Sequence, residues 1–108
     1  RPYPAGRHQK FGNLRKLCIL DFSNGPLIKL PPEIGKLKKM DSLNLGNTKL
    51  SHLPREIINL NLQFRWDESF FCSFDDGINL FNCPLKSPPV EILKKGRSAV
   101  KKYFKYHS

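Results

Sequence analysis

The chain has 108 residues, which suits one small domain, and its 19 Lys and Arg against 9 Asp and Glu give a net charge of +10. No apolar run approaches the roughly 18 residues of a membrane-spanning helix, and no G-x-x-x-x-G-K-[ST] phosphate loop occurs, so the sequence excludes both features. Three cysteines without a C-x-x-C spacing favour a reducing, cytoplasmic setting.

Residues 1–10 contain two prolines, one glycine and three basic residues, and they lack apolar periodicity. Such a composition is typical of a flexible segment, so we expect a flexible basic arm here. The chain begins with Arg, and it enters a repeated pattern at the back half of one unit. We therefore expect a part or fragment of a larger protein.

Residues 11–37 recur as residues 34–60 with a constant shift of 23 positions. Leu20 falls on Leu43 and Phe22 on Leu45, with no slip between them. A fixed period of roughly 20–29 residues with the pattern L-x-x-L-x-L marks a leucine-rich repeat. One such unit cannot bury its apolar face alone, so the repeats predict stacked units that form a solenoid.

Each repeat predicts the same local structure. Apolar and polar residues alternate over 17–22 and 40–45, which predicts short parallel strands with one buried face. The motif Leu-Pro-x-Glu-Ile at 30–34 and 53–57 predicts a turn of 3₁₀ helix, because proline suits a first helical turn. We expect these leucines and phenylalanine to share one core: Leu20, Phe22, Leu43, Leu45, Leu80 and Leu85.

The ninth position of the repeat, where asparagine usually binds the backbone of the turn, holds Gly25, Thr48 and Cys83. An asparagine comes one residue earlier in each unit. We therefore expect weaker side-chain bonding along the turns than in a regular repeat.

The register breaks after Leu60. Residues 60–66 alternate as a longer strand, an acidic and Phe-rich stretch follows, and the pattern resumes at Ile78. Ile78 lies 58 positions after Leu20, which is two periods plus 12 residues. We therefore expect an irregular insertion near 66–76 that bulges out of the stack.

The end of the chain predicts a capping helix over 87–108. Ser87 suits the N-cap and Pro88 the first helical position. We expect one helix from Pro88 to about Tyr106 that covers the last unit with an apolar face. That face consists of Ile92, Leu93, Val100, Tyr103 and Phe104.

The segments EIINLNLQFRWDE and GINLFNCPLKSPPVEILKKGRSAVKKYF are more specific. Residues 11–106 resemble the terminal repeats and C-terminal cap of Roco-type and related bacterial leucine-rich repeat proteins. The matching positions are Trp66-Asp67, Gly77-Ile78-Leu80, Pro84-Leu85-Pro88-Pro89, Glu91-Ile92, Gly96, Ala99 and Tyr103-Phe104. The chain departs from that group at Cys83, where asparagine is usual. In such proteins the cap usually leads into a Ras-like GTPase or another effector domain.

Repeats and resemblance together predict an α/β solenoid, a short right-handed coil with parallel strands on its concave face and a C-terminal capping helix. We expect three regions: the basic arm at 1–10, the repeats with their insertion at 11–86, and the cap at 87–108. No residue pattern indicates catalysis, a metal or a cofactor. The paired acids in 67–76 are compatible with a cation site or with solvated loop acids, and Cys72 with a reactive or an idle thiol.

The predicted function is a non-enzymatic protein-protein interaction module or scaffold within a signalling protein. Its partner would bind the polar strand positions of the concave face. An alternative is a basic adaptor that binds nucleic acid or anionic phospholipid through Lys94–Lys105, and another is the regulatory arm of a Roco-type GTPase. The edge of the first strand also predicts self-association. The candidate partner-binding residues are Asp21, Ser23, Asn44, Gln63, Arg65, Asn79 and Phe81.

Overall fold

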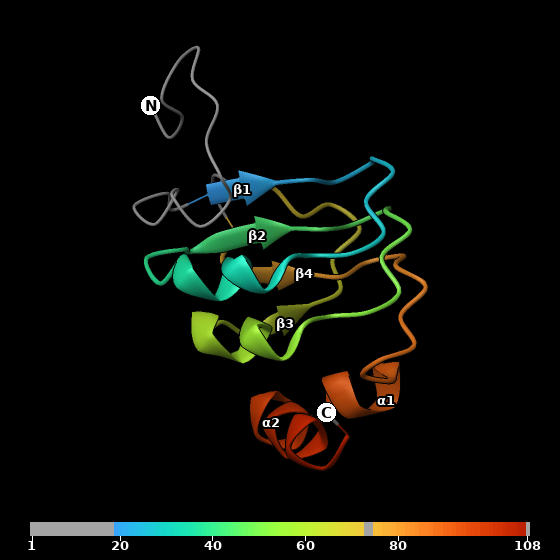
Figure 1. Ribbon diagram of the computed structural model, residues 1–108. Coiled ribbons are helices and arrows are strands. Elements are labelled where there is room, and N and C mark those ends of the chain that lie inside the picture. Colours follow the sequence, from blue (N-terminus) through green and yellow to red (C-terminus); the bar gives the residue numbers. More distant parts are fainter. Residues whose placement is uncertain (1–18, 73–74, 108) are drawn as a thin grey trace.

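The computed structural model describes residues 19–72 and 75–107, which form a compact α/β unit (Figure 1). Four parallel strands make one sheet: β1 (Ile19–Asp21), β2 (Ser42–Asn44), β3 (Phe64–Arg65) and β4 (Gly77–Asn79). Two 3₁₀ helices, η2 (Pro32–Lys36) and η3 (Arg55–Leu60), stack beside the sheet, and α1 (Val90–Lys94) and α2 (Arg97–Tyr106) lie at one end. The expected α/β class with parallel strands is confirmed.

The 23-residue spacing is confirmed as a structural register between β1 and β2. Leu20 pairs with Leu43, and Asp21 pairs with Asn44. The pairing continues past the strands, because the Phe22 amide donates to the Asn44 carbonyl at 2.8 Å. The predicted basic arm and the first two residues of the strand expected at 17–22 lie outside the described residues. The rest of that strand is described, and β1 lies at the edge of the sheet. Self-association through this edge stays a prediction.

The strands do not follow each other in sequence order. The sheet runs β1-β2-β4-β3, so β4 lies between β2 and β3 (Figure 1). Leu43 of β2 pairs with Ile78, 35 residues later, and Ile78 pairs on its other side with Phe64. The additional residues after β3 therefore form a crossover that returns the chain to a position inside the sheet. They do not simply lengthen a loop between sequential strands.

Gly77 makes this return possible. Its φ is +112°, and a Cβ atom there would lie 2.8 Å from the Gln63 carbonyl oxygen and 2.9 Å from the Arg65 Cγ. Only glycine adopts that conformation without strain, and only a residue without a side chain fits beside β3. The backbone of Gly77 is then free to donate to the Asp41 carbonyl at 2.9 Å.

The asparagines of the turns occupy left-handed backbone positions. Asn24, Asn47 and Asn82 have φ values of 59°, 57° and 58°, which asparagine tolerates better than most residues. At the next position, the Thr48 hydroxyl donates to the Leu45 carbonyl at 2.8 Å, and the Cys83 thiol donates to the same carbonyl at 3.0 Å. Thr48 and Cys83 therefore supply the turn bonding that an asparagine would give.

A single apolar core lies between the sheet and the two 3₁₀ helices. It includes five of the six residues that the sequence predicted for it, while Phe22 is half-buried and packs against it. The Leu-Pro-x-Glu-Ile motifs contribute Ile34 and Ile57, each at most 1% exposed, from η2 and η3. The five predicted residues that are buried in this core are Leu20, Leu43, Leu45, Leu80 and Leu85.

The predicted single capping helix is wrong in one respect, because two helices form. Gly96 separates α1 from α2 with a φ of +104°, a conformation that interrupts a helix. Helix α1 begins at Val90 with Pro89 as its N-cap, and not at Pro88 with Ser87 as its N-cap, and the Ser87–Pro88 peptide bond is cis. None of the helices within residues 19–72 and 75–107 is long and apolar enough to cross a membrane.

Two arginines fix the cap to η3. Arg55 of η3 donates to the Phe104 carbonyl in the last turn of α2 at 3.1 Å, and Arg97 at the start of α2 donates to the Ile58 carbonyl at 3.1 Å. Carbonyl groups in the last turn of an α-helix lack partners within the helix, so the Arg55 guanidinium supplies a donor to the Phe104 carbonyl. The Ile58 carbonyl also accepts from the Asn61 amide at 3.2 Å. Between these two bonds, Leu93 and Val100 are buried in the core.

Candidate interaction surface

We define the outer face of the sheet as the face on the side opposite the apolar core. Side chains alternate across a strand, so Leu20, Leu43 and Ile78 enter the core while their successors turn outward. The strand register places four of the seven predicted partner-binding residues in one row across this face. In order along the sheet they are Asp21, Asn44, Asn79 and Arg65.

The centre of this row is covered, which corrects our expectation that all seven residues are exposed. Asn44 is 6% exposed and Asn79 is 2% exposed. The Asn79 Nδ2 donates to the Asn44 Oδ1 at 3.0 Å and to the Asp67 carbonyl at 3.1 Å, while its Oδ1 accepts from the Asp67 amide at 2.9 Å. The two asparagines therefore join the sheet to the segment that crosses it.

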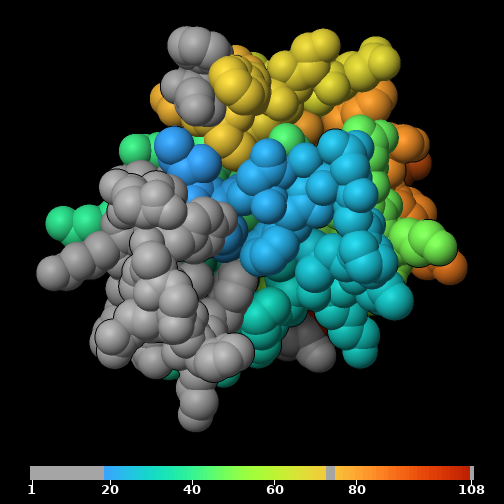
Figure 2. Space-filling view, turned by 90° about the horizontal axis from the view of Figure 1, so that it is seen from above, coloured from blue at the N-terminus to red at the C-terminus, as the bar shows by residue number. Residues whose placement is uncertain are grey.

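The described parts of the crossover, 66–72 and 75–76, pack against the sheet and do not form the bulge that the sequence predicted. Phe70 is only 8% exposed, and the buried Ser42 hydroxyl lies within hydrogen-bonding reach of the carbonyl oxygens of Cys72 (3.1 Å) and Asp75. Figure 2 shows this segment in yellow along the side of β1, which is blue. None of the described residues 66–72 and 75–76 belongs to a strand.

Arg65 organises the charges of the crossover. Its guanidinium forms ion pairs with Asp67 and with Asp75, the latter at 3.7 Å, and donates to the Asp76 carbonyl at 2.8 Å. It also lies 5.5 Å from the centre of the Phe70 ring. Two of the paired acids thus have a cationic partner, and no group of three metal-ligating side chains occurs among residues 19–72 and 75–107.

The other predicted residues lie at the margins of the covered centre. The Asp21 carboxylate is exposed and accepts hydrogen bonds from the Ser23 amide (2.8 Å) and hydroxyl (2.6 Å). Gln63 is exposed just before β3, and Phe81 is half-buried after β4. The structure therefore brings Asp21 and Ser23 together at one margin and separates them from Gln63 and Arg65 by the width of the sheet.

The Cys72 thiol is held in its protonated form. Burial raises its pKa from about 9.0 to about 11, and the carboxylates of Asp21 and Asp75 act in the same direction. A thiolate beside these acids would be poorly solvated and repelled, and the thiolate is the reactive species. The structure thus favours the idle-thiol interpretation of this residue.

The sequence reasoning missed Phe71. This side chain is 56% exposed in the crossover, one residue after the buried Phe70. Its amide donates to the Asp75 Oδ2 at 2.8 Å, and its carbonyl accepts from the Asp75 amide at 2.8 Å, so the backbone of the segment is well fixed. The available signal is the acidic, Phe-rich composition of 67–76, which indicates an exposed aromatic side chain among acids as well as an insertion.

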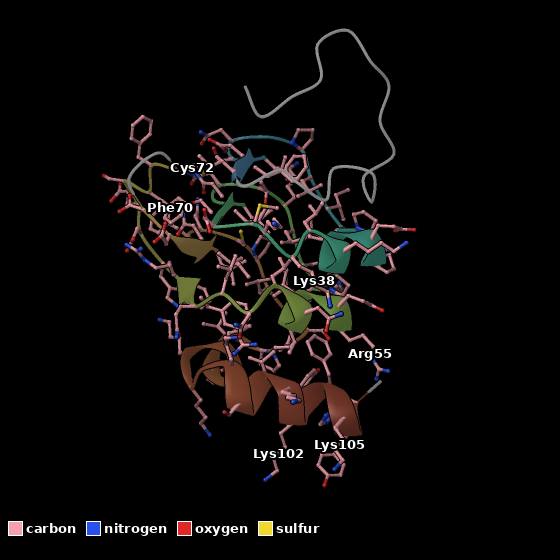
Figure 3. All side chains as sticks on the ribbon, turned by 90° about the vertical axis from the view of Figure 1, so that its left-hand side faces the viewer. Lys38, Arg55, Phe70, Cys72, Lys102 and Lys105 are labelled. Carbon is pink, nitrogen blue, oxygen red and sulfur yellow. The ribbon has the colours of Figure 1, made fainter. Side chains whose placement is uncertain are left out.

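Opposite charges lie on different parts of the molecule. The crossover at 66–76 has four acids and no base, whereas 92–107 in the cap has six Lys and Arg and no acid. Each 3₁₀ helix carries one acid and one base. Figure 3 shows Phe70 and Cys72 on one side of the sheet, Lys38 and Arg55 on the helical side, and Lys102 and Lys105 at the cap end. A search of protein-family models and of curated proteins finds no match to this chain.

Proposed function

We propose that this chain is a non-enzymatic protein-interaction module with a short leucine-rich repeat architecture, and that it binds a basic protein segment on the crossover that covers its outer face. The repeat architecture is supported by three features that recur in the chain. These are the 23-residue register of β1 and β2, the left-handed asparagines of the turns, and the 3₁₀ helices at both Leu-Pro-x-Glu-Ile motifs.

We infer the kind of partner from the position of Phe71 among carboxylates. Asp21, Glu68 and Asp76 are exposed, and the hydrogen bonds of Asp75 to the Phe71 backbone keep acid and ring together. Aromatic side chains are frequent anchors of protein interfaces, and complementary charge guides the approach of a partner. A partner segment with lysines or arginines around an apolar residue would match this surface.

A peptide-display selection on the intact chain tests the proposal. We expect the selected peptides to be rich in Lys and Arg, and we expect Phe71→Ala to weaken their binding about tenfold or more, as loss of an anchor does. Asp21→Lys should also weaken peptide binding, and the loss of affinity should be larger at low salt than at high salt.

Two control variants match these changes outside the crossover. Ile28 is 57% exposed, so Ile28→Ala removes a comparable apolar surface, and Glu33→Lys reverses an exposed charge on η2. Both should leave peptide binding unchanged. Peptides without basic residues, or binding that the control variants weaken as much as Phe71→Ala, would refute the proposed face.

A further inference from the structure

The outward face of α2 is a row of cations. Ser98, Lys101, Lys102 and Lys105 follow each other at helical spacing, and all four are exposed. Together with Tyr106 they line one shallow hollow of about 500 Å³. The opposite side of the helix buries Val100 in the core, so this face is set outward by the packing of the cap.

The surroundings of the hollow strengthen its positive charge. Residues 92–107 contain six lysines and arginines and no aspartate or glutamate. Along the sequence the nearest acid is Glu91 on α1, seven residues before Ser98, and in space Glu56 of η3 lines a neighbouring hollow together with Lys101. Lys95, between the two helices, is exposed and adds a further ammonium group at the same end of the molecule.

The kinds of side chain indicate what would bind. The two arginines of this region, Arg55 and Arg97, are committed to backbone carbonyls, so the exposed cations are lysines. Lysine acts as a point charge and suits diffuse anionic surfaces, whereas planar recognition of bases favours arginine. Tyr106 is 67% exposed, and a ring with a polar end is typical of a membrane-water interface.

We propose that the cap docks on an anionic membrane surface, with lipid headgroup phosphates in the hollow between Lys101, Lys102 and Lys105. The contact is electrostatic, because the apolar face of α2 is already used within the protein. Figure 3 shows Lys102 and Lys105 at the end of the molecule farthest from β1 and away from Phe70 and Cys72, so docking there leaves the crossover accessible.

Sedimentation with phosphatidylcholine vesicles that contain phosphatidylserine tests this proposal on the full chain. Each lysine near an anionic bilayer contributes about a fivefold increase in binding, so replacing all three lysines by glutamine should weaken binding about a hundredfold. Binding should also fall steeply with salt and vanish on pure phosphatidylcholine. Circular dichroism verifies that the variant is folded.

The matched control replaces Lys29, Lys39 and Lys49 by glutamine, which removes the same charge from exposed positions outside the cap. It should keep most of the vesicle binding. Equal losses in the two variants would show a non-local charge effect and overturn the proposal. So would tighter binding to random duplex DNA that the cap variant abolishes, or displacement from vesicles by inorganic phosphate at constant ionic strength.

Discussion

The two halves of the sheet are held together in different ways. Between β1 and β2 the pairing follows the sequence period, because each residue of β1 pairs with the residue 23 positions later, and Leu20 thus pairs with Leu43. Between β4 and β3 no such period exists, because the chain crosses the sheet and inserts β4 beside β2. There the structure depends on single residues, namely Gly77, Asn79 and Arg65.

This difference indicates where the protein tolerates change. A periodic stack distributes its stability over many similar apolar contacts, as repeat proteins generally do. A crossover relies on a few polar groups that are buried and therefore costly to leave unpaired. Mutations in the two halves should accordingly fail by different mechanisms, cavity formation in one and strain or unpaired polar groups in the other.

The largest effect is expected at Leu43, in the centre of the periodic half. Its side chain is fully buried, and it lies between Leu20 and Ile78 in the register. Leu43→Ala should lower the free energy of unfolding by about 2–5 kcal/mol, through lost burial and a residual cavity. Chemical denaturation measures this, with Ile28→Ala as the exposed control. A midpoint equal to that of the wild type would refute the shared core.

The next effect tests the crossover at Gly77. Gly77→Ala should cost about 1–3 kcal/mol through backbone strain alone, because φ is +112°. The added Cβ would also displace the Gln63 carbonyl. Gly25→Ala is the matched control, since its Cβ would approach no atom closer than 3.4 Å. Thermal unfolding of the two variants should differ clearly, and equal stability would contradict the insertion of β4 beside β3.

A somewhat smaller effect is expected at Asn79. Asn79→Ala removes three hydrogen bonds and leaves the Asp67 amide and the Asn44 side chain without these partners, at a cost of about 1–2 kcal/mol. The exposed Asn59→Ala serves as control. Hydrogen exchange should show that the Asp67 amide loses protection in the first variant only. Unchanged protection would mean that the asparagine does not hold the crossover.

The smallest effect concerns the Cys72 thiol, whose pKa is raised to about 11. The fold favours the neutral thiol, so this group supports stability fully below pH 9 and loses that support as the pH rises toward 11. In a Cys18→Ser, Cys83→Ser background, the rate of alkylation should increase with a midpoint near 11 when folded and near 9.0 when unfolded. Asp21→Asn should shift the folded midpoint downward. Equal midpoints in both states would contradict the burial of this thiol.

Much of the periodic half followed from the sequence. The constant spacing identified the strand pairs, the alternation identified which side chains are buried, and the proline motifs located the 3₁₀ helices. These predictions succeed because the repeat period, the burial of alternate side chains and the backbone geometry of a strand or turn all depend on residues close together in sequence. The candidate interface was predicted less well, since Asn44 and Asn79 have the polar character of surface residues but are covered by a segment distant in sequence.

The sequence by itself determined the first two strands, the turns and the apolar face of the cap, because each depends on residues a few positions apart. The longer strand expected over 60–66 is wrong, because η3 extends to Leu60 and only Phe64–Arg65 forms β3. Only the tertiary structure decided the order β1-β2-β4-β3, the burial of the asparagine pair and the separation of α1 from α2. These depend on which segment fits beside which, and on the space that Gly77 leaves for a returning chain. A sequence pattern gives the spacing of residues along the chain. Which of two strands lies beside a given strand depends instead on how their side chains pack.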